Sequence, residues 1–390
     1  MSIWYDVSGL VTWSRHQFGG IERVTSGILA GLVEHGTTVG LVHVPPRAVA
    51  YAPLAFADLP EIARRHVPLH PEDPRCRGER VAFAAGDVLL SLGGTFTIRG
   101  HHRAVEDARC RGVRIVRLLY DLIPATKPQW VPASPVWSAW TRHVLERSDV
   151  VLAISRFTAT EAARFCAAHG LPVPPLEVIR LGDVLDLQRG ATQAAPLPRF
   201  VPPRPFFLCV STVDVRKNHR ALYEAWRVLA GRRADRCPDL VCVGVPHVQV
   251  DELLHEIRHD RDVNRHFHVL HDVHDAELRW YYEHCLATIY PSKHEGWGLP
   301  VAESLGLGKL CIAAHATSMP EISADLPAWF EPHDVARLVA LVERVEDDPD
   351  WLRDREAAIR GTFRPTTWRD TAAQILEVIG AAGRVDDAAA

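Results

Sequence analysis

Residues Ala287–Gly308 read ATIYPSKHEGWGLPVAESLGLG, and they hold the strongest structural signal in the sequence. The apolar run Ala287–Tyr290 predicts a buried strand, and the Pro-Ser pair that follows it marks a turn. Glycines permit close backbone approach in the next loop, and a proline suited to a first helical turn opens a predicted helix at Pro300–Gly306. The stretch therefore predicts a strand, a loop and a helix in immediate succession, which is the repeating unit of α/β proteins.

The same alternation continues in both directions along the chain. Strands are predicted at Ser2–Val7, Thr38–Val44, Val88–Ser91, Arg114–Leu119, Val150–Ser155, Leu176–Arg180, Phe206–Ser211, Asp239–Val243, Phe267–Leu270 and Leu310–Ala313. Helical patterns fall between them, as at Gly20–Glu34, Pro135–Arg147, Ala159–His169, Arg220–Ala230, Asp251–His259, Asp275–Cys285, Val335–Glu346 and Trp351–Arg360. Apolar strands alternating with helices are typical of parallel sheets covered on both faces.

Length and composition favour two such sheets in a folded protein. A single core stops growing near ~250–300 residues, and this chain has 390. We predict Rossmann-like domains at residues 1–186 and 206–364, a linker at 187–205 with five prolines, and a helix in 365–390 that crosses back to the first domain. The net charge of −4 argues against nucleic acid as a partner.

Targeting and cysteine patterns indicate a cytoplasmic protein. Asp6 interrupts the first apolar stretch, so we expect no signal peptide, and no stretch approaches the ~18 apolar residues of a spanning helix. The eight cysteines are scattered without a CxxC pair, which is typical of buried thiols in a reducing compartment.

Two carboxylates and a helix N-terminus make the Ala287–Gly308 stretch a candidate site. Glu295 precedes the glycine loop and Glu303 lies one turn inside the predicted helix, a spacing of E-x7-E. The free N–H groups and positive dipole end of such a helix suit a phosphate. The carboxylates could accept hydrogen bonds from sugar and ribose hydroxyls. The alternative is a helix start with two solvated glutamates.

A second candidate lies in Val210–Leu222, VSTVDVRKNHRAL. A buried strand ends there, and a loop carries Arg216 and Lys217 before a helix that starts around Asn218, a residue type that suits an N-cap. Adjacent cations on such a loop can neutralise the charge that develops on a diphosphate leaving group. A basic pair on the surface is the alternative.

Two weaker candidates follow strands in the first half of the chain. Gly19 and Gly20, in FGGIER, open a helix whose amides could touch a phosphate, but the string lacks the G-x-G-x-x-G pattern of NAD binding. This absence argues against an NAD-linked oxidoreductase or epimerase. Asp121, in LYDLIPATKP, ends a strand where ligands gather in open α/β sheets. A turn or N-cap role is its alternative.

Taken in order, the strings FGGIERV, DLIP, ISRFTATEA, VSTVDVRKN and HEGWGLPVAESLGLG resemble retaining glycosyltransferase family 4. The resemblance spans roughly residues 3–325, and it is greatest to bacterial mannosyl- and rhamnosyltransferases of surface polysaccharide assembly. It implies the GT-B fold, with two Rossmann-like domains whose parallel sheets face a central cleft. The first domain would bind the acceptor, and the second would bind the nucleotide-sugar.

The resemblance also implies roles for individual residues. Glu295 would hold the donor sugar hydroxyls, Glu303 the ribose, and the Arg216–Lys217 pair the diphosphate. The remaining donor-binding residues implied by the family pattern are Gly19, Gly20, Val273, Gly296, Trp297, Gly298 and Leu299. Asp121 would be catalytic together with Glu295, Arg216 and Lys217. Tyr120 stands where the family often carries a histidine before this aspartate.

The implied reaction transfers a hexose, most simply mannose from GDP-mannose, to a saccharide or polyprenyl-diphosphate-linked acceptor with retention of configuration. Neither a metal ion nor a cofactor is expected, because fixed cations and helix ends would stabilise the leaving diphosphate. A UDP-sugar or dTDP-rhamnose donor, and a subunit that binds nucleotide-sugars without turnover, remain alternatives. A lipid-linked acceptor would bring the protein to the inner face of the cell membrane as a peripheral protein.

Other patterns have simpler interpretations. The two D-x-D strings, at Asp260 and Asp348, lie in charged helix-end segments and are expected at the surface. The four histidines of HFHVLHDVH lack a paired cysteine, and His101-His102 is expected in a loop. Trp137 and Trp140 fit either packing within the domain or a basic aromatic patch at a membrane interface.

Overall fold

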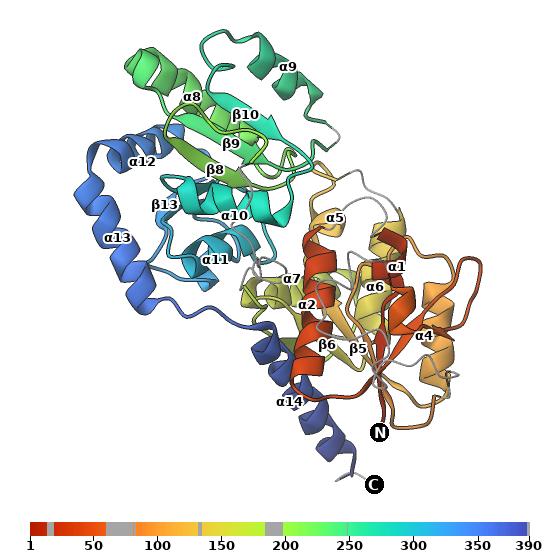
Figure 1. Ribbon diagram of the computed structural model, residues 1–390. Helices are drawn as coiled ribbons and strands as arrows, with labels where there is room; N and C mark the ends of the chain where they lie inside the picture. The colour runs from red at the N-terminus through yellow and green to blue at the C-terminus, as the bar shows by residue number, and fades with distance from the viewer. Residues whose placement is uncertain are drawn as a thin grey trace. The chain divides into compact units, whose positions relative to one another are not determined.

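The computed structural model describes residues 1–13, 19–59, 81, 83–131, 135–183, 198–247 and 249–387. The chain divides into two compact units, one formed by Met1–Gly182 with Thr366–Ala390 and the other by Asp183–Pro365. Each unit is a sheet flanked by helices (Figure 1). Of the predicted linker, residues 187–197 lie outside the described part of the chain.

The sheet of the first unit has the strand order β3-β2-β1-β4-β5-β6-β7. Its strands are β1 (Ile3–Asp6), β2 (Val39–His43), β3 (Ala52–Pro53), β4 (Val88–Ser91), β5 (Arg114–Leu119), β6 (Val150–Ala153) and β7 (Leu176–Val178). The edge strand β3 is antiparallel to β2, and the other pairs are parallel. The strand order reverses between β1 and β4, which makes their carboxyl ends the topological switch point, the usual ligand position in such sheets.

Helices cover both faces of this sheet. They are α1 (Ser8–Trp13), α2 (Gly20–Glu34), α4 (His101–Cys110), α5 (Ile123–Thr126), α6 (Pro135–Arg147), α7 (Arg156–His169) and α14 (Trp368–Asp387), with a 3₁₀ turn η1 (Phe56–Asp58). Helix α14 packs on α2, where a Cβ added to Gly27 would lie 2.4 Å from the Trp368 ring. The Thr371 hydroxyl also donates a hydrogen bond of 2.9 Å to the Arg180 carbonyl. The last helix therefore completes the first unit.

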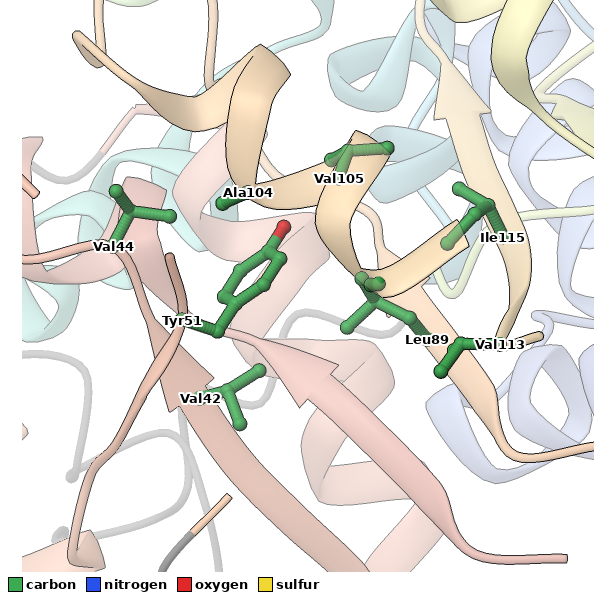
Figure 2. Close-up of a cluster of buried hydrophobic side chains, with 9 residues drawn as sticks. Val42, Val44, Tyr51, Leu89, Ala104, Val105, Val113 and Ile115 are labelled. Carbon is green, nitrogen blue, oxygen red and sulfur yellow. The ribbon is translucent and has the colours of Figure 1, made fainter. Parts of the chain in front are cut away.

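The apolar core of this unit is built by alternating strand residues and one helix stripe. Val42, Leu89 and Ile115 come from strands β2, β4 and β5 of this sheet and meet Ala104 and Val105 of α4 (Figure 2). Each fully buried side chain of this kind contributes about 1.5–3 kcal/mol relative to exposure. This burial fixes the sheet on which the strand ends are presented.

The sheet of the second unit is entirely parallel among the described residues. Its order is β10-β9-β8-β11-β12-β13. The strands are β8 (Phe206–Val210), β9 (Asp239–Val243), β10 (Phe267–Leu270), β11 (Thr288–Tyr290), β12 (Cys311–Ala314) and β13 (Ala328–Phe330). The strand order reverses between β8 and β11, so the carboxyl ends of these two strands form the switch point of this unit.

The helices of the second unit begin close to where the sequence predicts them. They are α8 (His219–Arg233), α9 (Asp251–His259), α10 (Asp275–His284), α11 (Leu299–Gly306), α12 (Val335–Asp347) and α13 (Pro349–Thr362), with 3₁₀ turns η3 (Ala234–Arg236) and η4 (Met319–Glu321). Asp334 and Asp348 cap α12 and α13 by accepting N–H hydrogen bonds of 2.8 and 3.0 Å. The D-x-D string at Asp348 is therefore a helix cap, as its charged context indicated.

The predicted strands and helices are present with ends shifted by a few residues, but the short helices α1 and α5, the 3₁₀ turns, strands β3 and β13 and helix α4 were missed. Strands β3 and β13 are too short to show alternation. Helix α4 was missed because it has a polar sequence, in which only His101, Ala104, Val105 and Ala108 are buried. The prediction of a loop at His101-His102 is therefore wrong, since both residues begin α4.

Candidate active site

The switch point of the second unit brings three predicted site residues into contact. Arg216 and Lys217 lie in the loop after β8, and Glu295 lies in the loop after β11. The Arg216 guanidinium donates to Glu295 Oε2 at 2.9 Å, and Lys217 Nζ donates to Oε1 at 2.6 Å. The two loops are also joined through their main chains, because the Lys293 N–H donates to the Arg216 carbonyl at 2.9 Å. The basic pair is thus part of a built site.

Two further hydroxyls, which the sequence analysis missed, complete this cluster. The Tyr290 hydroxyl donates to Glu295 Oε1 at 2.9 Å and accepts from Lys217 Nζ at 2.7 Å. The Ser292 hydroxyl donates to the same Oε1 at 2.6 Å. Both residues end or follow the buried strand β11, so a polar side chain at a strand end was the signal that could have revealed them.

The charges in this cluster stabilise one another. Burial would raise the pKa of Glu295, but Arg216 and Lys217 outweigh it and lower that pKa to about 2. Burial lowers the pKa of Lys217, while Glu295 opposes the change. Burial also raises the pKa of Tyr290 well above its usual value. At neutral pH the site therefore holds a carboxylate, a neutral phenol and two side chains that can carry positive charge.

The loop that leads into α11 is built for close backbone packing. Gly298 is the N-cap of α11 with φ +110°, a left-handed conformation that L side chains rarely adopt. A Cβ at this position would also lie 3.1 Å from Met319 Cγ. Gly296 and Trp297 are buried beside it, and Leu299 begins the helix. The N-terminus of α11, with its positive dipole end, thus lies at the switch point.

Glu303 and Val273 have different surroundings from Glu295. Glu303 lies one turn inside α11, is buried, and accepts a 3.1 Å hydrogen bond from the Tyr282 hydroxyl. Val273 lies between β10 and α10 and packs against the apolar cluster that contains Phe206. The second carboxylate of the E-x7-E spacing is therefore hydrogen-bonded to a side chain of α10.

The remaining predicted residues belong to the first unit. Gly19 is the N-cap of α2, and its N–H donates to Glu22 Oε2 at 3.0 Å. Gly20 begins this helix and is exposed. Asp121 Oδ1 accepts the Ile123 N–H at 2.9 Å, which is the turn geometry considered as its alternative. The Tyr120 hydroxyl donates to the Leu92 carbonyl at 2.8 Å.

The switch point of the first unit holds a buried polar network that the sequence analysis also missed. Asp6 Oδ2 lies 2.7 Å from His101 Nε2 and accepts hydrogen bonds from the hydroxyls of Ser91 and Tyr51 at 2.9 and 3.0 Å. Arg117 lies on the other side of the imidazole, 3.4 Å from Nδ1. Burial raises the pKa of Asp6, but His101 and the hydrogen bonds lower it to about 2. Every member of this network is buried.

One group of potential metal ligands converges among the described residues. Ligand atoms of Cys209, His219 and Cys242 lie within 4.8 Å of one another, and all three side chains are buried. Structural zinc takes four ligands, and the second nitrogen of a zinc-bound histidine normally has its own partner. Three residues are present here, and His219 Nδ1 has no hydrogen-bond partner among the described residues. The group fits buried thiols better than a metal centre.

The two tryptophans of α6 pack within the first unit. Trp140 is buried and donates through Nε1 to the Thr95 hydroxyl at 3.2 Å. The Trp137 ring stacks on Phe96 with 3.7 Å between centroids. These contacts support the packing interpretation over the interfacial patch. None of the described helices combines the length and apolar character that crossing a bilayer requires.

Comparisons with known proteins agree with this architecture. Residues 198–362 match the family model "Glycosyl transferases group 1". The serotype-specific mannosyltransferase WbdA of Escherichia coli is 24% identical over 269 residues, which cover 68% of this chain and 33% of that protein. The O-antigen chain mannosyltransferase B of the same organism is 24% identical over 279 residues, covering 67% and 69%. The chain thus matches about a third of the length of WbdA.

A solved structure gives the fold. Sucrose-phosphate synthase from Thermosynechococcus elongatus superposes with a TM-score of 0.65 at 16% identity, and the superposition covers 100% of both chains. The expected GT-B fold is confirmed. The chain has the GT-B fold, its second unit carries a match to the glycosyl transferases group 1 family, and its sequence is similar to bacterial mannosyltransferases.

Proposed function

We propose that the chain transfers a hexose from a nucleotide-sugar to a saccharide acceptor with retention of configuration and without a divalent ion. One observation carries the proposal: Arg216 and Lys217 meet Glu295 at the β8–β11 switch point, beside the N-terminus of α11. Two cations and a helix N-terminus at one position form a site for a diphosphate. The adjacent carboxylate can accept hydrogen bonds from sugar hydroxyls.

The proposed chemistry depends on positioning and on charge. Arg216 and Lys217 bind the diphosphate and stabilise the negative charge that grows on it as the bond to the anomeric carbon breaks. The acceptor hydroxyl attacks the anomeric carbon on the face from which the diphosphate leaves, and its proton passes to the leaving phosphate. Glu295 orients the sugar ring, and Glu303 binds the ribose. The carboxylate of Asp121 lies in the first unit, and we assign it to the acceptor.

For the substrates, we propose GDP-mannose as donor and a lipid-linked oligosaccharide of surface polysaccharide assembly as acceptor. Support comes from the similarity to WbdA and to the O-antigen chain mannosyltransferase B, whose names state mannosyl transfer. Such an acceptor would bring the enzyme to the membrane surface as a peripheral protein. Sedimentation with vesicles that contain the lipid acceptor, compared with vesicles without it, would measure this association.

The experiment is a donor panel. The protein is incubated with GDP-mannose, UDP-glucose or dTDP-rhamnose over lipid-linked acceptor extracts, in chelator and then with manganese, and the products are analysed for linkage and anomeric configuration. We expect an α-mannosyl product from GDP-mannose in chelator. Turnover of UDP-glucose or dTDP-rhamnose, but not of GDP-mannose, would refute GDP-mannose as the donor. A product with inverted anomeric configuration would refute the retaining mechanism. Release of no nucleoside diphosphate from any donor would refute the transfer itself.

A further inference from the structure

The segment between β12 and η4 holds the main chain of Glu295. The Glu295 N–H donates to Thr317 Oγ1 at 2.9 Å, and the same hydroxyl donates to the Glu295 carbonyl at 3.0 Å. One threonine side chain therefore satisfies both main-chain groups of one glutamate. Next to it, the buried Ser318 hydroxyl donates to the carbonyls of Glu295 and Trp297 at 2.9 and 3.1 Å.

The backbone of Thr317 is strained. Its φ is +51°, in the left-handed region that β-branched residues avoid. Such strain persists only where the surrounding structure holds it, and it concentrates at functional sites. A glycine would adopt this conformation without cost, but it would lack the hydroxyl that bridges the two main-chain groups of Glu295. Thr317 therefore supplies the hydroxyl at the cost of a strained backbone conformation.

The position of the Glu295 main chain decides what its carboxylate can reach. Lys217, Tyr290 and Ser292 all donate to Oε1 at 2.6–2.9 Å, and these donors come from segments other than that of Thr317. A main-chain shift of about 1 Å would lengthen every one of these contacts, and misplacement on this scale can cost on the order of 10²-fold in rate.

From these contacts we infer that Thr317 is a positioning residue, which acts through Glu295 to set where the donor sugar is held. The inference rests on the proposed function, because it assigns the sugar contact to Glu295. The inference also distinguishes recognition of the donor sugar from recognition of the donor diphosphate. The sugar depends on Thr317 through Glu295, whereas the diphosphate depends on Arg216 and Lys217, whose own loop Thr317 does not contact in the hydrogen bonds of the described structure.

Three variants test it. Thr317→Val removes the hydroxyl and keeps the shape. Thr317→Gly removes the hydroxyl and relieves the strained φ. Thr317→Ser keeps the hydroxyl and serves as the matched rescue. For each we would measure kcat and KM for donor turnover, the affinity for GDP by calorimetry, and the unfolding temperature.

We expect kcat to fall on the order of 10²-fold in Thr317→Val and Thr317→Gly and to stay near wild type in Thr317→Ser. The affinity for GDP should change less than threefold in all three. Relief of the strained φ should make the glycine variant more stable than the valine variant, and its measured unfolding temperature shows that it is folded at the assay temperature, so that its loss of rate is not due to unfolding.

Wild-type kcat in the glycine variant would overturn the inference, because the hydroxyl would then be dispensable. A serine variant as slow as the valine variant would overturn it too. If the wild-type protein binds no nucleoside diphosphate, the proposed function fails instead, and the two failures are thereby distinguished.

Discussion

The two units present the same strand reversal but fill it in different ways. At the β1–β4 end, Asp6 is enclosed by His101, Ser91 and Tyr51, and the whole network is buried. At the β8–β11 end, the carboxylate of Glu295 is paired with Arg216 and Lys217, whose side chains remain 19% and 12% exposed. The first is a closed polar core, whereas the second keeps charged atoms at the surface.

This difference separates structural from functional electrostatics. A buried carboxylate with a complete set of partners has no capacity left for a ligand, and removing one member leaves unpaired buried charge. Cations that keep some exposure can exchange an internal carboxylate for phosphate oxygens. We therefore expect substitutions at the first switch point to change stability, and substitutions of the partly exposed cations at the second to change mainly activity.

The largest expected effect is on stability at the first switch point. Asp6→Asn removes the buried charge that accepts hydrogen bonds from Ser91 and Tyr51 and faces His101, and each hydrogen bond to a charged group is worth about 1.5–3 kcal/mol. Urea denaturation would measure the change in the free energy of unfolding. The control is Asp58→Asn, at an exposed aspartate of the same unit, which should stay within about 0.5 kcal/mol of wild type. Equal stability of both variants would contradict the structural interpretation.

The next effect is on turnover at the second switch point. Lys217→Ala removes a cation from the diphosphate site, and loss of one such group costs on the order of 10²–10³-fold in kcat. Steady-state kinetics with GDP-mannose would measure it. Lys293→Ala, in the neighbouring loop, is the matched control and should retain most of the activity. The comparison between the units breaks down if Lys217→Ala unfolds the protein as readily as Asp6→Asn does.

A smaller effect is expected from the hydroxyl that joins the charged groups. Tyr290→Phe removes a hydrogen bond to Glu295 and another from Lys217. Bonds to charged groups are worth about 1.5–3 kcal/mol, whereas neutral ones contribute about 0.5–1.5 kcal/mol. Tyr281→Phe, which loses one bond to the Phe200 carbonyl, is therefore the control. The unfolding temperatures of the two variants would be compared, and we expect the larger decrease in Tyr290→Phe. A larger decrease in Tyr281→Phe would contradict the charges assigned to Glu295 and Lys217.

The smallest effect is a change in pH dependence. Burial lowers the pKa of His101 below its usual 6.5, and Asp6 only partly offsets this. The unfolded chain then binds the proton more readily than the folded one, so the free energy of unfolding falls as pH falls below 6.5. In His101→Gln, the free energy of unfolding should fall less steeply between pH 7 and pH 5 than in wild type. Denaturant titrations at intervals of about 0.5 pH unit would measure this slope. An unchanged slope would show that His101 is not held neutral.

Much of the second site could be predicted because its chemistry is local in sequence. Arg216, Lys217 and Glu295 each follow an apolar strand, and the carboxyl ends of parallel strands lie at one edge of a sheet. Their direct pairing could not be predicted, because it depends on β8 and β11 being neighbours. Thr317 gave no signal, since its contact with Glu295 spans 22 positions and depends on a left-handed backbone.

The first site was harder to predict for the same physical reason. Asp6 and His101 are separated by 95 positions, and neither lies in a string that resembles a motif. The polar sequence of α4 also hid the helix that carries His101. Buried polar networks are defined by tertiary contacts, so a single sequence shows their members only as isolated polar residues.

Calorimetric titration of GDP into the wild-type protein and into Lys217→Ala, each in chelator and in manganese, tests the central claim most directly. If fixed cations at the β8–β11 switch point hold the diphosphate, the wild type binds GDP equally well in both buffers and Lys217→Ala binds it at least tenfold more weakly. Binding that requires manganese, or that is unaffected by loss of Lys217, would contradict the account.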